Sequence, residues 1–144
     1  MSEATRIANV LGGIKVLKRE IKDMDDLVAI TREGLPVKVV TILQNRTGVG
    51  RESFETWITL SKRTYARRQG EGYLKPDESD RAVRIARVVA RAEEALGDPE
   101  KAKLWLTRPI RALGMVAPIT LLDTDPGAQQ VTAVLGRIEH GTFS

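Results

Sequence analysis

The stretch RESFETWITLSKRTYARRQG, residues 51–70, predicts two short helices joined by a tight turn. Its first half carries apolar side chains at helical spacing, which predict a buried face. These side chains are Phe54, Trp57, Ile58 and Leu60. Ser61 follows them, and serine is a favoured N-cap because its hydroxyl accepts a backbone N–H of the next turn. We therefore expect a second helix from Lys62 to about Gln69.

The second helix carries side chains suited to contact with DNA. In a helix-turn-helix, the first helix packs inward, and the N-terminal side chains of the second project into the major groove. Arginine pairs with guanine edges or phosphates, and threonine donates to phosphates or touches a thymine methyl group. The candidate DNA-binding residues are Lys62, Arg63, Thr64, Arg67 and Arg68, whereas Tyr65 would face inward. A solvated basic face without DNA affinity is the alternative that the pattern leaves open.

The charge of the chain is concentrated near this candidate helix. The formal net charge of the 144 residues is +4. Residues 1–76 carry 14 basic and 9 acidic side chains, whereas residues 77–144 carry 9 and 10. The segment 61–75 alone holds five basic side chains and one acidic one. The net charge of the chain is modest, but its basic side chains are concentrated in the N-terminal half. This distribution favours an anionic partner for that half.

Apolar spacing predicts helices in the rest of the N-terminal half as well. Two short helices are expected between Ile14 and Ile30, because the acidic cluster at 23–26 interrupts the pattern. Pro36 is expected at the first position of the next helix, where its missing N–H costs little. A longer helix should follow to Leu96, with acidic residues at its start and Gly97 just past its end.

The C-terminal half also predicts helices, so the fold should be all-α. The last helix is expected to have Asp125 as its N-cap and Pro126 at its first position. Trp105 is expected to anchor the core of this half. A stripe of arginines at helical spacing should be solvated, or should pair with Glu93, Glu94 or a partner's acidic groups; these arginines are Arg84, Arg87 and Arg91.

The residues that catalysis requires are mostly absent. His140 is the only histidine, and it is expected at the solvated end of the last helix. The acidic pair in DTD, residues 123–125, is explained by a capping turn, and GVG, residues 48–50, lacks the rest of a phosphate-binding loop. No metal-ligand spacing is present. We therefore expect no enzymatic activity, no cofactor and no metal.

Two further features bear on where the chain works. The sequence contains no cysteine, which fits a reducing compartment. Its start has no basic-then-apolar order of a signal peptide, and no apolar run approaches the roughly 18 residues that span a bilayer. A cytoplasmic protein without a membrane partner is the expectation.

The C-terminal half, AEEALGDPEKAKLWLTRPIRALGMVAPITLLDTDPGAQQVTAVLGRIEHGTFS, resembles the toxin-binding domain of the Xre/MbcA/ParS antitoxins. The residues that carry this resemblance include Gly97, Trp105, Pro109, Leu113, Gly114, Pro118, Asp123, Thr124, Gly127, Glu139 and Gly141. Upstream, DLVAITREGLPVKVVTIL, SKRTYARR and ESDRAVRIARV resemble the Cro-like helix-turn-helix region of the same family. One departure is GMVAP, residues 114–118, where the family suggests a more polar connection.

The resemblance implies both an organisation and a function. Residues 1–25 would form an N-terminal helical segment, 26–97 a Cro-like helix-turn-helix DNA-binding domain, and 98–144 a small helical toxin-binding domain. Such antitoxins neutralise RES-domain toxins, which deplete NAD or modify another metabolic target, and they bind the operator of the shared operon. The implied partners are thus a RES-domain toxin and double-stranded operator DNA, bound as a homodimer within a toxin–antitoxin complex. A toxin-neutralising or scaffold module without DNA affinity is the alternative.

The resemblance also suggests where the toxin binds. The candidate toxin-binding residues are Arg137, His140, Thr142, Phe143 and Ser144. A C-terminal tail with Phe143 and a terminal carboxylate could enter the basic dinucleotide cleft of such a toxin and mask it. A frayed end without a role is the alternative.

Overall fold

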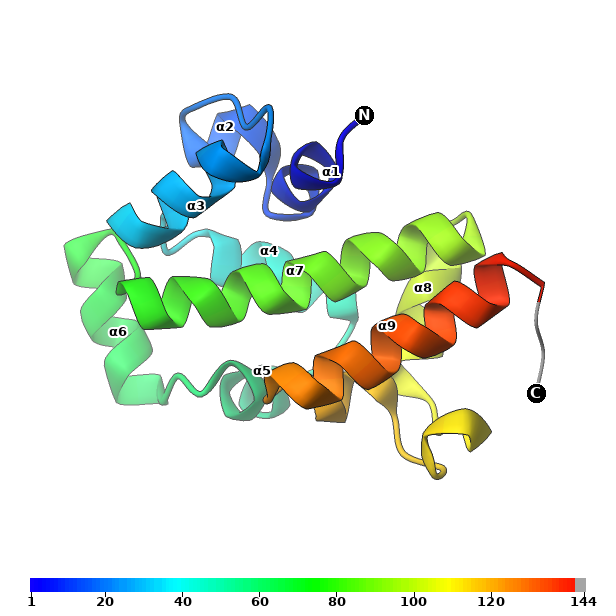
Figure 1. Cartoon of the computed structure of the whole chain (residues 1–144). Helices are drawn as coiled ribbons and strands as arrows, with labels where there is room; N and C mark the ends of the chain where they lie inside the picture. The colour runs from blue at the N-terminus through cyan, green and yellow to red at the C-terminus, as the bar shows by residue number, and fades with distance from the viewer. Residues whose placement is uncertain (142–144) are drawn as a thin grey trace.

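The computed structural model describes residues 1–141, and its architecture is all-α, as the apolar spacing predicts (Figure 1). The α-helices in this range are α1 (Glu3–Val10), α2 (Gly13–Leu17), α3 (Met24–Glu33), α4 (Val39–Thr47), α5 (Arg51–Ile58), α6 (Lys62–Glu71), α7 (Pro76–Leu96), α8 (Pro99–Thr107) and α9 (Asp125–Glu139). Two short 3-10 helices, η1 (Arg111–Leu113) and η2 (Pro118–Leu121), connect α8 to α9. Within residues 1–141 there is no strand.

Helix α7 is the long central element, and six other helices pack along it (Figure 1). Its contacts are with α1, α3, α4, α5, α8 and α9. The predicted features of its ends are confirmed. Asp77 and Glu78 occupy the first turn, where the helix dipole favours acidic groups, and Gly97 ends the helix with a left-handed φ of 77°.

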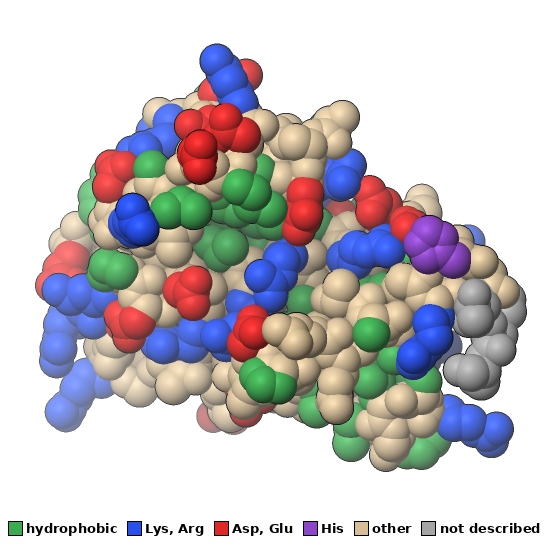
Figure 2. Space-filling view, in the orientation of Figure 1, with side chains coloured by type: hydrophobic (Ala, Val, Ile, Leu, Met, Phe, Trp, Pro, Cys, Tyr) green, Lys and Arg blue, Asp and Glu red, His purple; other side chains and the backbone are tan. Residues whose placement is uncertain are grey.

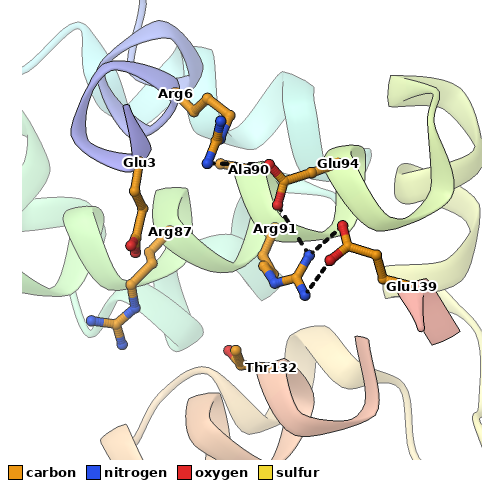
Figure 3. Close-up of a pocket in the computed structure, with 8 residues that line it drawn as sticks. All are labelled: Glu3, Arg6, Arg87, Ala90, Arg91, Glu94, Thr132 and Glu139. Atoms are coloured by element: carbon orange, nitrogen blue, oxygen red, sulfur yellow. Dashed lines mark hydrogen bonds and ion pairs between the residues drawn. The ribbon is translucent and has the colours of Figure 1, made fainter. Parts of the chain in front are cut away.

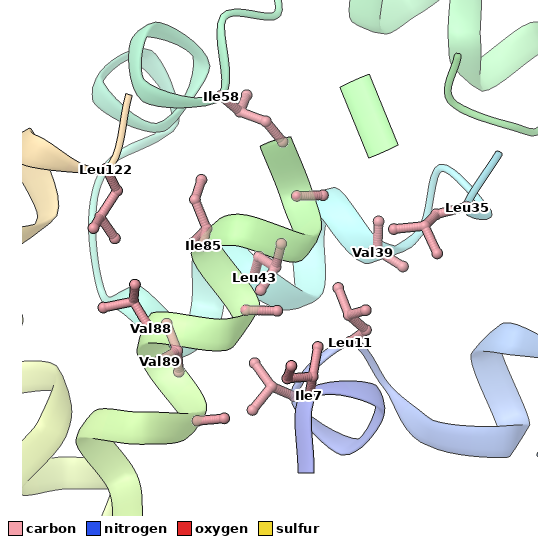
Figure 4. Close-up of a cluster of buried hydrophobic side chains, with 14 of the residues drawn as sticks. Ile7, Leu11, Leu35, Val39, Leu43, Ile58, Ile85, Val88, Val89 and Leu122 are labelled. Atoms are coloured by element: carbon pink, nitrogen blue, oxygen red, sulfur yellow. The ribbon is translucent and has the colours of Figure 1, made fainter. Parts of the chain in front are cut away.

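The hydrophobic core runs without a break from α1 to α9. One face of α7 supplies its centre with small and β-branched side chains: Ala82, Ile85, Ala86, Val88, Val89 and Ala92. Around these lie fully buried side chains from the other elements, namely Ile7, Leu11, Leu35, Val39, Leu43, Ile58 and Leu122 (Figure 4). The segment before α3 therefore packs on the same core as the helices of the helix-turn-helix.

The two short helices expected between residues 14 and 30 are confirmed as α2 and α3. The Asp23 carboxylate caps α3 by accepting the backbone N–H of Asp26 at 2.9 Å.

Trp105 was expected to anchor the core of the C-terminal half, but the structure buries it only in part. Its side chain is half-buried and packs against the core from the edge of α8.

The expected position of Pro36 is wrong, because α4 begins only at Val39. Pro36 instead forms an isolated antiparallel bridge with Tyr73 in the loop between α6 and α7, and a turn at Val37 and Lys38 leads into α4. The Val37 N–H donates to the Gly72 carbonyl at 3.0 Å, and the Leu74 N–H donates to the Leu35 carbonyl at 2.8 Å. A contact with a loop almost forty residues away thus decides the local structure here. The sequence around Pro36 does not predict this contact.

The expected cap of the last helix is wrong by one residue. Thr124 is the N-cap of α9, with its hydroxyl accepting the Gly127 N–H at 3.1 Å. Asp125 is the first helical residue, and Pro126 is the second. Threonine and aspartate are both good N-caps, so local propensity alone does not separate them. Gly127 also packs closely at this helix start, because a Cβ there would lie 2.0 Å from the Leu121 carbonyl oxygen.

Candidate nucleic-acid and partner interfaces

The helices α5 and α6 form the predicted helix-turn-helix, with a turn at Thr59, Leu60 and Ser61. Thr59 has a left-handed φ of 56°, which is uncommon for a β-branched residue. Leu60 is fully buried, and its N–H donates to the Glu55 carbonyl at 2.9 Å. The predicted N-cap is confirmed, because the Ser61 hydroxyl accepts the Thr64 N–H at 3.1 Å. The turn is thus fixed by a backbone hydrogen bond on the α5 side and by a side-chain cap on the α6 side.

An arginine on α7 holds this turn against the body of the molecule. The Arg81 Nε donates to the Ile58 carbonyl at 2.8 Å, and its Nη2 donates to the Thr59 carbonyl at 3.4 Å. These are carbonyls at the C-terminal end of α5, which have no partner within that helix. The orientation of α6 is therefore coupled to α7.

Three of the candidate DNA-binding side chains project from α6 into solvent. Lys62, Arg63 and Arg67 are exposed, and none of them makes an ion pair with any described residue. Lys and Arg side chains gather at the edge of the molecule where α6 lies (Figure 2). Thr64 is half-buried, and its hydroxyl accepts a hydrogen bond from Ser61 at 3.0 Å. The N-terminal part of α6 is therefore a surface of free cationic donors.

Arg68 does not belong to this surface, which corrects the expectation from sequence. Its residue is only 7% exposed, and its guanidinium binds the Glu78 carboxylate through two hydrogen bonds, at 2.7 and 2.9 Å. A third bond, at 3.0 Å, goes to Glu71. One turn after Tyr65, the helix directs this side chain towards α7 instead of towards solvent. Its donors are occupied, so we leave it out of the proposed DNA contacts.

The Arg68–Glu78 pair also joins the two ends of the loop between α6 and α7. Glu78 accepts the Lys75 N–H at 2.9 Å in addition to the two bonds from Arg68. Burial alone raises the pKa of the Glu78 carboxyl, but the hydrogen bonds from Arg68 and Lys75 outweigh burial and lower the pKa below its ordinary value. Glu78 is therefore a charged structural group.

Arg51 is a cationic side chain near α6 that the sequence analysis did not single out. Its guanidinium lies over the Tyr65 ring, 4.8 Å from the centroid, in a cation–π contact. The Tyr65 hydroxyl in turn lies 3.3 Å from the Thr41 hydroxyl. Arg51 is exposed and begins α5, so it adds positive charge at a helix N-terminus beside α6. The sequence signal for this role is its position directly after Gly50, at the expected start of a helix.

The candidate toxin-binding residues lie at the end of α9, as far as they are described. Arg137 and His140 are both exposed there, and Arg137 makes no ion pair with a residue in the range 1–141. Thr142, Phe143 and Ser144 lie outside the described residues.

A loop after α8 presents apolar side chains that the sequence analysis noted only as a departure in GMVAP. Met115 is 60% exposed, and Val116 is 40% exposed. The loop is held closed by the Ile110 N–H, which donates to the Val116 carbonyl at 3.1 Å, and by the Met115 N–H, which donates to the Ile110 carbonyl at 2.9 Å. Exposed Arg108 and Arg111 lie in the same loop. We call Met115 and Val116 the apolar loop tip.

The arginine stripe of α7 ties α7 to α9 rather than lying free in solvent. Arg91 binds Glu139 through two bonds of 2.9 Å and Glu94 at 3.1 Å, which confirms the expected pairing with Glu94 (Figure 3). Arg87 lies 3.5 Å from Asp125. Arg84 donates to the Asp123 carbonyl at 3.3 Å. The stripe is therefore largely an internal contact.

The same network extends to the first helix. The Arg6 guanidinium lies 3.1 Å from Glu94, so α1, α7 and α9 meet at one cluster of charges (Figure 3). Glu93 points elsewhere and lies 3.4 Å from Arg46 on α4. Burial raises the pKa of the Glu93 carboxyl, whereas the hydrogen bonds from Arg91 lower the pKa of Glu139. The end of α9 is thus anchored by an ionised Glu139.

Two negative findings concern the part of the chain that the structure describes. None of its helices is both long and apolar enough to cross a bilayer. No three His, Asp or Glu side chains of residues 1–141 converge as a metal site.

Comparison with known proteins gives two matches to protein families that together cover most of the chain. Residues 26–87 match the antitoxin Xre-like helix-turn-helix domain, and residues 91–141 match the antitoxin Xre/MbcA/ParS C-terminal toxin-binding domain. Antitoxin Xre of Photorhabdus laumondii is 43% identical, over 82% of this chain and 81% of the relative. Antitoxin Xre of Yersinia enterocolitica is 34% identical, over 81% of this chain and 91% of the relative. A protein named Prs ADP-ribosylating antitoxin, from a Sphingobium strain, is 34% identical over about half of each chain.

Proposed function

Since this chain belongs to the Xre/MbcA/ParS family of type II antitoxins, with a helix-turn-helix domain and a toxin-binding domain, we propose that it neutralises a RES-domain toxin and represses its own operon. In this role it needs no catalytic group, cofactor or metal. Binding to operator DNA would use α6, and binding to the toxin would use the end of α9 and the loop after α8.

The observation that carries this proposal is the separation of the two candidate surfaces. The free cations of α6 lie at one end of α7, whereas α8 and the end of α9 lie at the other (Figure 1). The 21 residues of α7 span about 32 Å at a rise of 1.5 Å per residue. The two proposed surfaces are therefore about one long helix apart on the same molecule.

For the DNA, we propose Lys62, Arg63, Thr64 and Arg67 as the contacts of α6, with Arg51 as an added phosphate contact. The N-terminal turn of α6 would enter the major groove, where arginine reads guanine and lysine binds phosphate. A dimer would double the footprint over a pseudo-palindrome. The alternative function, a toxin-binding module without DNA affinity, is disfavoured by the lack of intramolecular partners for Lys62, Arg63 and Arg67 among residues 1–141.

A mobility shift on the DNA upstream of the gene, at stated salt, tests the DNA part. The wild-type chain should bind with an affinity that falls as salt rises. Arg63→Ala with Arg67→Ala should weaken binding by roughly 30-fold or more, because each good bidentate base contact contributes roughly 1–3 kcal/mol. Arg111→Ala is a matched control, since Arg111 is exposed in the loop after α8. Unchanged binding by the double variant would exclude α6 as the reading helix.

For the toxin, we propose that Arg137 and His140 on α9 bind together with Thr142, Phe143 and Ser144, and that Phe143 enters the dinucleotide cleft. The apolar loop tip would add a hydrophobic anchor. A neighbouring reading frame that encodes a RES-domain protein would support the partner, and co-purification of the two would test it. Deletion of residues 142–144 tests the tail: undiminished neutralisation would exclude tail insertion and leave the rest of the surface in place.

A further inference from the structure

The proposed reading helix, α6, is attached to the rest of the molecule by few buried side chains. Of its ten residues, only Tyr65 and Arg68 are buried. Helix α6 lies at the edge of the molecule, beside the beginning of α7 (Figure 1). Because so little apolar surface is buried along α6, its orientation depends strongly on the polar contacts at its two ends.

Two side chains of α7 make these polar contacts, and they lie one turn apart. Glu78 binds Arg68, near the C-terminal end of α6, at 2.7 and 2.9 Å. Arg81 binds the turn that precedes α6, donating to the Ile58 carbonyl at 2.8 Å and to the Thr59 carbonyl at 3.4 Å. Residues three apart lie on the same face of a helix. One face of α7 therefore holds α6 at its end and at the turn before its start.

The Arg81 guanidinium is directed at this turn. Its Nε and Nη2 donate to the two carbonyls, and its Nη1 lies 3.6 Å from the Asp77 carboxylate, one turn earlier on α7. The Arg81 side chain is only 22% exposed. The planar fork of arginine can bind two neighbouring acceptors at once, whereas the lysine ammonium acts as a point charge. These contacts fit a residue that holds the turn better than one that donates to DNA.

The turn that Arg81 holds sets the angle between α5 and α6. Leu60 is fixed in the core, so a backbone change at Thr59 would reorient α6 as a whole. A binding element that is already held in its bound orientation loses less conformational freedom on binding, and its affinity is higher for that reason. The contact from Arg81 can therefore affect DNA affinity from outside the DNA interface.

We propose that Arg81 is a positioning residue for operator binding, which presents α6 to the DNA in its bound orientation without contacting the DNA. This inference rests on the proposed function, in which α6 enters the major groove. Loss of the Arg81 side chain leaves every side chain of α6 in place and frees the helix to reorient. The affinity for DNA should then fall to the same extent for every sequence.

Mobility shifts with Arg81→Ala on the upstream DNA, at several salt concentrations, test this role. The variant should bind about tenfold more weakly or worse, because the charge-assisted hydrogen bonds that hold the turn are lost. Its ranking of operators with single base changes should match that of the wild type, and so should its salt dependence. Relaxed preference at one position would show a base contact, and a salt slope lower by about one would show a phosphate contact. Either result, or wild-type affinity, would overturn the proposal.

Two further variants serve as controls. Arg84 lies one turn after Arg81 on α7 and also donates to a backbone carbonyl, that of Asp123 at 3.3 Å, outside the helix-turn-helix. Arg84→Ala should therefore bind DNA like the wild type. Arg81→Lys keeps the charge but not the fork, so it should restore only part of the affinity; full restoration would show that charge alone matters, against the proposal. Circular dichroism should show that each variant is folded at the assay temperature.

Amide hydrogen exchange of the full chain without DNA gives a readout that does not depend on the proposed function. The Leu60 N–H donates to the Glu55 carbonyl at 2.9 Å, so its exchange rate reports opening of the turn. Arg81→Ala should raise this rate about tenfold or more, whereas the Leu135 amide in α9 should exchange as in the wild type. An unchanged rate at Leu60 would refute the hold on the turn, whatever the DNA affinity. A wild-type chain that binds no operator would instead overturn the proposed function, and with it the role of Arg81 in DNA binding.

Discussion

At the scale of single residues, Arg67 and Arg68 show how neighbours of one type can have different roles. Arg67 is exposed and free of ion pairs within residues 1–141, whereas Arg68 is buried against Glu78. Successive residues of a helix point about 100° apart, so only one of the two can face the DNA. Of these two neighbouring arginines, Arg67 is thus available to a partner, whereas Arg68 stabilises the fold.

Replacing each arginine with alanine should separate these roles. Arg68→Ala leaves the Glu78 carboxylate buried without its partner, so the melting temperature should fall by roughly 6–12 °C, while the DNA sequence preference of the folded protein stays unchanged. Arg67→Ala should weaken DNA binding and leave the melting temperature within about 2 °C. Thermal unfolding and mobility shifts measure both. An Arg68→Ala protein of normal stability that has lost DNA binding would contradict this assignment.

The Glu78 carboxyl should make the fold sensitive to acid. Its pKa is lowered in the folded state, so the folded chain binds fewer protons than the unfolded chain just below the ordinary glutamate pKa of about 4.3. The stabilising effect is therefore complete above that pH and is lost as the pH falls through the lower folded value. Glu78→Gln should flatten the dependence of stability on pH between about 3 and 5. Urea unfolding at several pH values measures this, and Glu20→Gln, an exposed site, is the control; equal slopes in both variants would refute it.

Thr59 holds a backbone conformation that threonine rarely adopts. A left-handed φ costs a non-glycine residue roughly 1–2 kcal/mol, whereas glycine adopts it freely. Thr59→Gly should therefore raise the free energy of unfolding by about 0.5–1 kcal/mol, after the larger entropy loss of glycine is subtracted. Thr56→Gly, one turn earlier in the regular part of α5, should instead be destabilising. Urea unfolding of both variants decides; a destabilised Thr59→Gly protein would show that the turn is not strained.

At the scale of elements, the sequence predicts those helix ends that are determined by neighbouring residues. The cap at Ser61 and the glycine after Leu96 are each specified by a few neighbouring residues, and both are confirmed. The start of α4 is set by a loop almost forty residues further on, and the burial of Arg68 depends on a partner across the α6–α7 loop. The spacing of residues in the sequence does not reveal such distant contacts. The helices could therefore be predicted, but the sequence could not show which of their basic side chains are free to bind a partner.

The loop after α8 carries a prediction at the same scale. Replacing exposed apolar side chains at a loop tip with polar ones removes no packing contact within the folded chain. Such side chains can nevertheless anchor a partner. Met115→Ser with Val116→Ser should weaken toxin binding by roughly 10–100-fold and leave DNA binding and the melting temperature unchanged. Calorimetric titration with the toxin measures this effect. Leu104→Ser, an exposed apolar site on α8, is the matched control, and unchanged toxin affinity in the loop variant would remove the loop from the interface.

At the scale of the whole molecule, α7 connects every candidate surface. Its Arg81 holds the α5–α6 turn, its Val83 and Arg87 line a groove beside α3, and its Arg91 anchors α9. A single continuous core extends along it, so we expect the two ends to move together. DNA binding and toxin binding should therefore be compatible within one molecule, and neither should require the other end to unfold.

The placement of the two proposed surfaces at opposite ends of α7 predicts a ternary complex of DNA, antitoxin and toxin. With the antitoxin saturated by toxin, the operator should still be bound within about threefold of the original affinity per dimer, because the two proposed surfaces lie at opposite ends of α7, which is about 32 Å long. Mobility shifts with increasing toxin should show a slower, supershifted band rather than release of free DNA. Arg63→Ala with Arg67→Ala should abolish both bands while its toxin affinity stays normal. Release of the DNA by stoichiometric toxin would mean that the two ends are coupled and would contradict this prediction.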